Sequence, residues 1–472
     1  MPTMDARKFA SLILILFAPF LHGCGKSYSS MPVSPGPGPQ SAAVTVTIRD
    51  TPPAGVTVLA LELTVNGAIL NPGSYPLLST PTRIEVKQLE TDTAFLSTAS
   101  IPPGTYQSIT VNLTNPELTI LNQSGAAIGG CANNSVCELS PAAAGNITFS
   151  GAPFPIVVQS GSPVGFQVDV NVASLVTNAL SLDFNAAGAV SLTQLPLPGR
   201  PADHLDDLDD LMGAVQNLDA TAKTFTLHSA TGDFSVQVNS NTQFEFEKCP
   251  ANNFSCLLNT QVVKVDLQVM PGGAMVAKKV EFEDDAMDDE LVGAVFKIDD
   301  AMRFEMVVLG ELRSINNVSP GNPVVVTLSN ASFEVKADGL SVPSALQGAF
   351  TSASDTSQLI PGQVLEIRPS TAITLGPPIA VTTDRVRLRK TQLTANVAGA
   401  PAPPNFVVGS LPGLFTGAGI TSIGVQTSSA TDFEGVSGAQ ALADQNVVSL
   451  RGLLFNNGAN PPQLIADKIR KR

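Results

Sequence analysis

The sequence has few of the side chains on which binding and catalytic sites are most often built. Its 472 residues include no tryptophan, three tyrosines and three histidines, and charged residues make up only 14%. Sugar-binding sites usually need an exposed aromatic platform with a polar tip, so this scarcity argues against a carbohydrate-binding module. The net charge of −14 argues against nucleic-acid binding, because an acidic protein repels phosphate backbones.

Familiar enzyme signatures are also missing. The sequence contains no G-x-S-x-G, G-x-G-x-x-G or H-E-x-x-H motif. His22 lies in an N-terminal apolar segment, His204 in an acidic stretch, and His228 at the end of an expected strand, where a histidine is usually a surface residue. We therefore predict no enzyme, with no catalytic residue, no cofactor and no metal ligand. Carboxylates are numerous, so a hydrolase with a carboxylate pair remains an alternative, but no pair stands out.

The N-terminal segment predicts export. Arg7 and Lys8 precede the apolar run 9–21, which is shorter than the ~20 residues that span a bilayer. The stretch 9–24 ends in LHGC and resembles a bacterial lipoprotein signal. This resemblance implies that residues 1–23 are a signal peptide and that Cys24 is lipidated. Because Gly25 rather than aspartate follows, it also implies the outer membrane. An uncleaved signal anchor or a buried helix are the alternatives.

Four further cysteines form two close pairs. The segments CANNSVC and CPANNFSC place one pair at Cys131 and Cys137 and the other at Cys249 and Cys256. In an oxidising compartment both pairs should be disulfides. A metal site is the alternative, but no histidine lies near either pair.

The rest of the composition predicts an all-β protein. Glycine and proline number 38 and 36, and short runs rich in Val, Ile, Thr and Phe recur throughout. Residues 24–42 are rich in Pro, Gly and Ser, so we expect a spacer without a core. Nine candidate strands follow within 43–194, among them 43–49, 108–113, 117–121 and 180–184, and they favour an immunoglobulin- or transthyretin-like sandwich.

This first domain resembles an uncharacterised N-terminal domain of bacterial lipoproteins. The resemblance rests on TIRDTPPAGVTVLALELTVNG (47–67), IPPGTYQSITVNL (101–113), FQVDVNV (166–172) and LSLDFNAAG (180–188). It implies no chemistry, because the family has none established.

Two acidic runs flank the next region. DHLDDLDD (203–210) ends a linker placed at 195–208, and EDDAMDDE (283–290) follows later. Both are predicted to be solvated hinges, because like charges repel and extend a linker. Calcium binding is the alternative, although neither run has the spacing of a calcium loop.

The remaining sequence is repetitive. LMGAVQNLD (211–219) recurs as LVGAVFKID (291–299), and a third copy opens weakly at 405–411. Three repeats are therefore predicted, at 209–284, 290–397 and 404–472. Each has about five strands, with Gly213 and Gly293 allowing the sharp bend of a small closed barrel. The repeats resemble a small β-barrel domain of bacterial exported proteins and, in strand order and size, the OB-fold.

A Phe-Glu pair recurs in the repeats and a basic segment closes the third. We predict a buried Phe and an exposed Glu at each pair, namely Phe244-Glu245, Phe333-Glu334 and Phe433-Glu434. We expect the basic segment to keep an edge strand soluble, with contact to anionic lipid as the alternative; it comprises Lys468, Arg470, Lys471 and Arg472.

Taken together, these features predict a protein tethered to the cell envelope through Cys24, with one sandwich and three barrels. Its expected role is structural or binding, with the membrane and an envelope protein or polysaccharide as partners. The alternatives are a periplasmic or surface hydrolase, which should have a deep polar pocket, and an adhesion or scaffold module that pairs strands with its partner.

Overall fold

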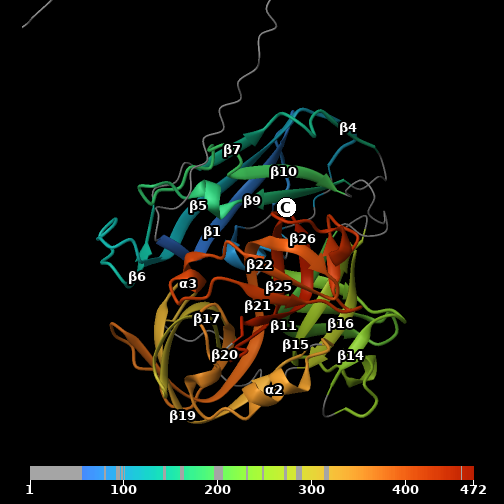
Figure 1. Cartoon of the computed structure of the whole chain (residues 1–472). Helices are drawn as coiled ribbons and strands as arrows, with labels where there is room; N and C mark the ends of the chain where they lie inside the picture. Colours follow the sequence, from blue (N-terminus) through green and yellow to red (C-terminus); the bar gives the residue numbers. More distant parts are fainter. Residues whose placement is uncertain are drawn as a thin grey trace, which may run out of the picture. The chain divides into compact units, whose positions relative to one another are not determined.

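Strands form most of the chain, as the short β-branched runs predict (Figure 1). The computed structural model describes residues 56–78, 81–91, 96, 99, 101–141, 145–159, 164–195, 206–229, 232–246, 249–270, 274–282, 290–312, 318–337, 339–458 and 460–472. Residues 48–472 belong to one compact unit. The predicted signal 1–23, Cys24, the spacer 24–42 and the predicted strand 43–49 lie outside the described residues. The all-β fold class is confirmed.

The first domain encloses its core between one large sheet and two ribbons. Its elements are β1 (Val56–Asn71), β2 (Tyr75–Pro76), β3 (Thr82–Glu85), η1 (Val86–Leu89), β4 (Gly104–Tyr106), β5 (Ser108–Asn122), β6 (Ser135–Leu139), β7 (Asn146–Phe149), β8 (Ile156–Val158), β9 (Gly165–Val170), α1 (Val172–Leu175) and β10 (Val190–Leu195). The sheet has the order β2-β1-β5-β6, with β3 on β1 and β7 on β5, while β4–β8 and β9–β10 form the ribbons. Leu61, Leu63 and Val65 of β1 point into the shared core.

Three predicted strands of this domain differ from the structure. The expected strands 108–113 and 117–121 are one continuous strand, β5, because Asn115 takes a left-handed φ of 48° that carries the chain through a bend without ending it. The expected strand 180–184 is a series of turns with one isolated bridge, from Leu182 to Val176.

Three barrels follow, which we name barrel 1 (206–282), barrel 2 (290–389) and barrel 3 (390–472). Barrel 1 contains β11 (Asp206–Asp219), β12 (Thr224–Ser229), β13 (Gly232–Gln237), β14 (Gln243–Glu245), η2 (Phe254–Cys256), β15 (Val262–Val269) and β16 (Met275–Phe282). Barrel 2 contains β17 (Glu290–Asp300), β18 (Arg303–Leu312), β19 (Pro323–Val335), α2 (Ser344–Thr351), η3 (Thr356–Gln358), β20 (Val364–Pro369) and the first part of β21 (Ile379–Ala402). Barrel 3 contains the rest of β21, then β22 (Asn405–Gly409), α3 (Gly413–Thr416), β23 (Ile423–Gln426), β24 (Asp432–Glu434), η4 (Ala439–Ala441), β25 (Val447–Phe455) and β26 (Gln463–Lys471).

Each barrel closes into a ring in the same way. Its first strand pairs antiparallel with the second and the fourth, and its third strand pairs in parallel with the fifth. In barrel 1 these strands are β11, β12, β13, β15 and β16, with β14 as a short addition to β16. The side chains that alternate inward fill each ring with apolar residues. The predicted small closed barrels are therefore confirmed.

Barrels 2 and 3 share one strand, which the sequence did not predict. Residues 379–389 of β21 pair with β19 and β20, whereas residues 390–402 pair with β22 and β25. The segment 405–411, expected to open the third repeat, instead begins with β22, the second strand of barrel 3. Similarly, β11 begins at Asp206, so the predicted linker 195–208 extends into a paired strand.

The shared strand also contains the missing third copy of the repeated opening. Val215, Val295 and Val397 each donate and accept one backbone hydrogen bond at the turn before their barrel's fourth strand. Val397 therefore aligns with the valines of the two GAV sequences, and Ala395 stands where Gly213 and Gly293 stand in the other barrels. The sequence signal is thus L-x-[GA]-x-V, which Leu393 to Val397 satisfies.

We expect Gly293→Ala to destabilise barrel 2. A β-carbon at Gly293 would lie 2.7 Å from the Val307 carbonyl oxygen and 2.9 Å from the Met306 sulfur, so the paired strand must move. The expected cost is about 1–3 kcal/mol, measured by urea unfolding. Gly310→Ala in the neighbouring strand is the matched control, because nothing lies within 4 Å of its β-carbon position. Equal losses for the two variants would contradict this account.

Candidate functional site: charged pairs on the last strand of each barrel

Both predicted disulfides are present. Cys131 and Cys137 are joined in the first domain, and Cys249 and Cys256 are joined in barrel 1. The first bond links the loop after β5 to β6, and the second closes the loop between β14 and β15. The two pairs therefore fasten irregular segments to their sheets. The predicted lipidation residue, Cys24, lies outside the described residues.

The repeated Phe-Glu pairs lie on strands that run parallel to the last strand of each barrel. In each barrel the glutamate contacts a cation on that last strand: Glu245 to Lys279 at 2.9 Å, Glu334 to Arg387 at 3.0 Å and Glu434 to Arg470 at 2.8 Å. Glu245 and Glu334 are exposed at 48% and 42% of the side chain, as predicted, but Glu434 is 13% exposed. Phe333 is buried, whereas Phe244 and Phe433 are half-buried.

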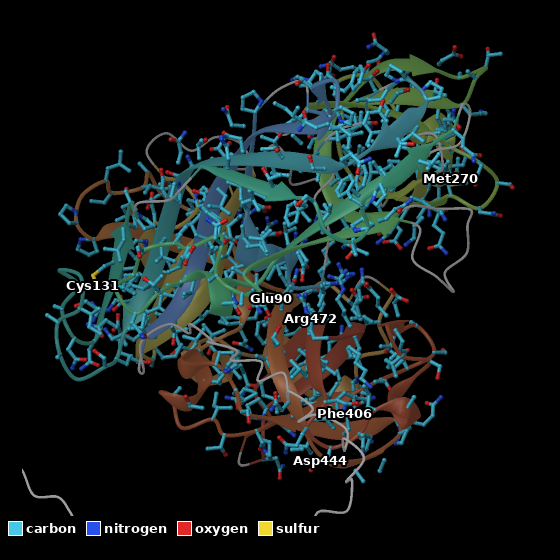
Figure 2. The ribbon with its side chains drawn as sticks, turned by 90° about the horizontal axis from the view of Figure 1, so that it is seen from above. Glu90, Cys131, Met270, Phe406, Asp444 and Arg472 are labelled. Carbon is cyan, nitrogen blue, oxygen red and sulfur yellow. A yellow bond between two sulfur atoms is a disulfide. The ribbon has the colours of Figure 1, made fainter. Side chains whose placement is uncertain are left out.

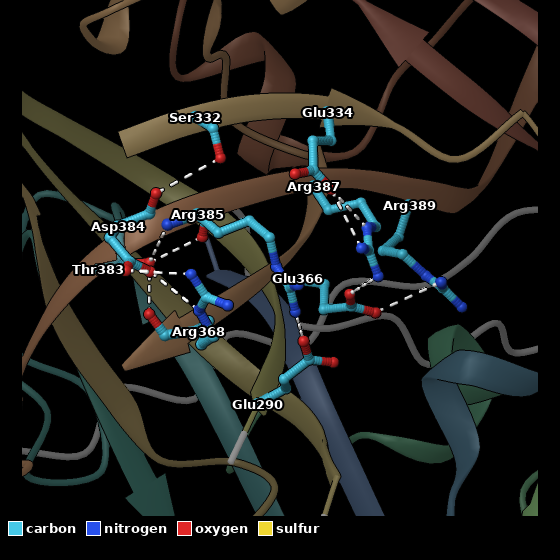
Figure 3. A network of polar contacts seen from close by, with 10 residues as sticks. All are labelled: Glu290, Ser332, Glu334, Glu366, Arg368, Thr383, Asp384, Arg385, Arg387 and Arg389. Carbon is cyan, nitrogen blue, oxygen red and sulfur yellow. Dashed lines mark hydrogen bonds and ion pairs between the residues drawn. The ribbon is translucent and has the colours of Figure 1, made fainter. Parts of the chain in front are cut away.

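The most extensive set of charges lies on β21, where three arginines alternate with core residues (Figure 3). We name Arg385, Arg387 and Arg389 the arginine ladder. Because side chains alternate across a strand, Val386 and Leu388 fill barrel 2 while the ladder points outward. Glu366 of the adjacent β20 accepts from Arg387 at 2.7 Å and contacts Arg389 at 3.3 Å, with 3% of its side chain exposed.

The first arginine of the ladder, Arg385, is buried together with the glutamate that it contacts. Arg385 contacts Glu290, the first residue of β17, and the two residues are 5% and 0% exposed. Sequence reasoning placed Glu290 at the end of a solvated acidic run, which is wrong for this residue. The arginine ladder is the sequence signal that would have indicated the burial of Glu290. Three arginines at alternate positions of one strand need carboxylates on neighbouring strands.

A second group of charges joins the first domain to barrel 3, where Glu90 and Arg472 lie side by side (Figure 2). Arg472 donates to the Glu90 carbonyl oxygen at 2.7 Å and to the Asp169 carboxylate at 3.1 Å. The Glu90 carboxylate contacts Lys87 and accepts from the Thr394 hydroxyl at 2.7 Å.

The basic segment 468–472 is therefore not a free solvated edge. Lys468 and Arg470 are 6% and 8% exposed, and Arg472 is held by the first domain. The prediction that this segment mainly keeps an edge strand soluble is wrong.

The Glu90 contacts predict an acid-sensitive stability. Burial raises the pKa of the Glu90 carboxyl, but the charges of Lys87 and Arg472 and the bonds from Lys87 and Thr394 together lower it below 4.5. A lowered pKa stabilises the fold above that value, and the contribution disappears as the pH falls through the folded-state pKa. Glu90→Gln should therefore unfold at lower urea than wild type at pH 7, and the difference should shrink as the pH is lowered through the acid range. A difference that does not change with pH would contradict this.

Other candidate groups are structural or lie at the surface. Lys297 lies between two carboxylates, 2.7 Å from Asp299 and 2.6 Å from Glu305, on the β17–β18 hairpin. Their hydrogen bonds raise the pKa of the Lys297 ammonium. This carboxylate pair is bridged by a cation and so does not resemble the separated acid and base of a glycosidase. His228 pairs with Asp233, and both side chains are more than half exposed.

The described residues lack two further features that would indicate a metal centre or a membrane span. They contain no group of three or more His, Cys, Asp or Glu side chains arranged to hold a metal ion. Within the same residues, no helix has both the length and the apolar character needed to cross a membrane.

Two stretches of the chain match families of uncharacterised domains. Residues 41–194 match a domain of unknown function (DUF4382), which covers the first domain. Residues 212–281 match a second domain of unknown function (DUF5666), which covers nearly all of barrel 1. The chain matches no curated protein. The resemblance of both regions to uncharacterised domains is thus confirmed, and the shared ring order extends the barrel 1 architecture to barrels 2 and 3.

Proposed function

We propose that this chain is a lipid-anchored protein of the bacterial cell envelope with a structural or partner-binding role. The observation that carries the proposal is the use of charge in the barrels. The buried carboxylates of Glu290 and Glu366 form ion pairs with the arginine ladder inside the protein. Groups engaged in this way are held within the fold and are not presented to a substrate.

Contacts between the domains support a structural role. The Thr119 hydroxyl of the first domain donates to the Gly321 carbonyl of barrel 2 at 3.0 Å. Close by, the Asn322 side-chain amide donates to the Glu138 carboxylate at 2.7 Å. Arg472 adds the contact between the first domain and barrel 3. We therefore expect the first domain, barrel 2 and barrel 3 to behave as one body.

The proposed cellular location rests on the sequence and on the disulfides. Disulfides persist in oxidising compartments, so the bonds Cys131–Cys137 and Cys249–Cys256 agree with export. One acyl chain holds a protein only marginally, whereas two or more hold it stably. The lipid expected on Cys24 would fix one end of the chain and leave the β domains projecting from the bilayer.

The test of this function is the mass of the protein isolated from its native host. We expect a chain that begins at Cys24 and carries three acyl chains, recovered in the membrane fraction. Cys24→Ser should abolish the acyl mass. An unmodified Cys24 with residues 1–23 retained, or acyl mass that persists in the Cys24→Ser variant, would contradict the proposal.

A further inference from the structure

Apolar contacts join three of the four domains. Leu59 and Leu121 of the first domain form one cluster with Phe296 and Val307 of barrel 2. The core of barrel 2 also includes residues of barrel 3, namely Leu453, Phe455 and Ile465. We call the first domain, barrel 2 and barrel 3 the frame, because buried apolar surface holds them together without a directional requirement.

Barrel 1 is joined differently. Among the described residues, its apolar cluster contains side chains only from within barrel 1, from Leu211 to Phe282. Its core is therefore complete without a neighbour. The family match to residues 212–281 alone agrees with a self-contained module.

Among the described residues, an ion pair joins barrel 1 to the frame. Glu281 of β16 contacts Lys336, which follows β19 of barrel 2, at 2.8 Å, and both side chains are 14% exposed. Two barrel 1 lysines share the same carboxylate: Lys279 lies 3.3 Å from it, and the charge of the buried Lys264 also acts on it. One carboxylate thus faces three ammonium groups from both barrels.

The environment of Glu281 favours its charged form. Burial raises the pKa of the Glu281 carboxyl, but Lys336, Lys279 and Lys264 together lower it below 4.5. An ion pair of this kind is present above that pH and is lost as the pH falls through the folded-state pKa.

We propose that barrel 1 is a separable module, latched to the frame by the Glu281–Lys336 ion pair. Loss of the latch releases barrel 1 as a folded unit and leaves the frame intact. The device adds a conformational change to the envelope role proposed above, and it does not depend on where the protein is located.

Lys336→Gln tests the latch, because Lys336 lies in barrel 2 and its loss leaves the Glu281–Lys279 pair of barrel 1 in place. Small-angle X-ray scattering would be measured at pH 7.5 on the full chain carrying Cys24→Ser, with wild type at Lys336 as the reference. We expect the radius of gyration to rise by about 2 Å, roughly a tenth of the value for a compact body of this size. Circular dichroism should be unchanged.

Lys297→Gln is the matched control. It removes a lysine from barrel 2 whose partners, Asp299 and Glu305, are also in barrel 2, so its scattering should equal that of wild type. Unchanged scattering for Lys336→Gln would overturn the proposal. Equal expansion in both variants would overturn it too, since the effect would then come from lost charge in general, and expansion with lost dichroism would indicate unfolding in place of release.

Discussion

Replacing Arg385 by methionine is expected to cost about 3–5 kcal/mol of folding free energy, because it leaves a buried carboxylate without its counter-charge. Glu290 is 0% exposed and contacts this arginine from β17. The loss would be measured by urea unfolding, in the transition that includes barrel 2. The double variant Glu290→Met with Arg385→Met should recover most of it, since a buried ion pair can often be replaced by apolar side chains of similar volume.

Arg303→Met is the control for this experiment. Arg303 also pairs with carboxylates, Asp299 at 3.3 Å and Asp300 at 3.4 Å, but its side chain is 51% exposed. An exposed pair contributes about 0–1 kcal/mol. If Arg385→Met cost no more than Arg303→Met, or if the double variant were as unstable as the single one, Glu290 would not be the buried charge that this account describes.

Phe350→Ala is expected to lower stability by a similar amount, about 3–5 kcal/mol, by opening a cavity where two barrels meet. Phe350 of α2 is 1% exposed, and its ring packs edge-on against Phe333 of barrel 2 and Phe455 of barrel 3, with centroids 5.5 and 6.3 Å away. Thermal unfolding should show that barrels 2 and 3 both lose stability, because the missing ring lies in the cluster that packs barrel 2 against Leu453, Phe455 and Ile465 of barrel 3.

Two variants calibrate that result. Phe350→Leu keeps most of the volume and should cost clearly less than alanine. Leu375→Ala removes an apolar side chain that is 50% exposed, so we expect a change within about 0.5 kcal/mol. A Phe350→Ala variant that destabilises barrel 2 alone would show that the two barrels unfold independently.

Local sequence patterns predicted the strands and the barrels well. Alternating residues such as Val263, Val265 and Leu267 fixed which face of a strand is buried, and all three are 0–1% exposed. The close spacing within each cysteine pair likewise predicted both disulfides. These features depend on residues near one another in the chain, which a single sequence displays directly.

Features that depend on distant residues were not predicted. Nothing near β21 indicates that residues 379–389 and 390–402 serve different barrels, because that division is set by pairing with β19, β20, β22 and β25. The burial of Glu290 depends on Arg385, which lies far along the chain. A charged side chain is usually exposed to solvent. A prediction made on that basis fails where oppositely charged partners from other strands bury the side chain.

Hydrogen exchange of the full chain tests the central claim most directly, namely that charged and apolar contacts fuse three domains into one frame beside a separate barrel 1. If the frame is one cooperative body, the slowest amides of β1, β21 and β25 exchange with a common opening free energy. The amides of β11, β15 and β16 then exchange as a second group with a different value. Independent opening of β1 from β21 and β25, or a single value shared by all six strands, would contradict the account.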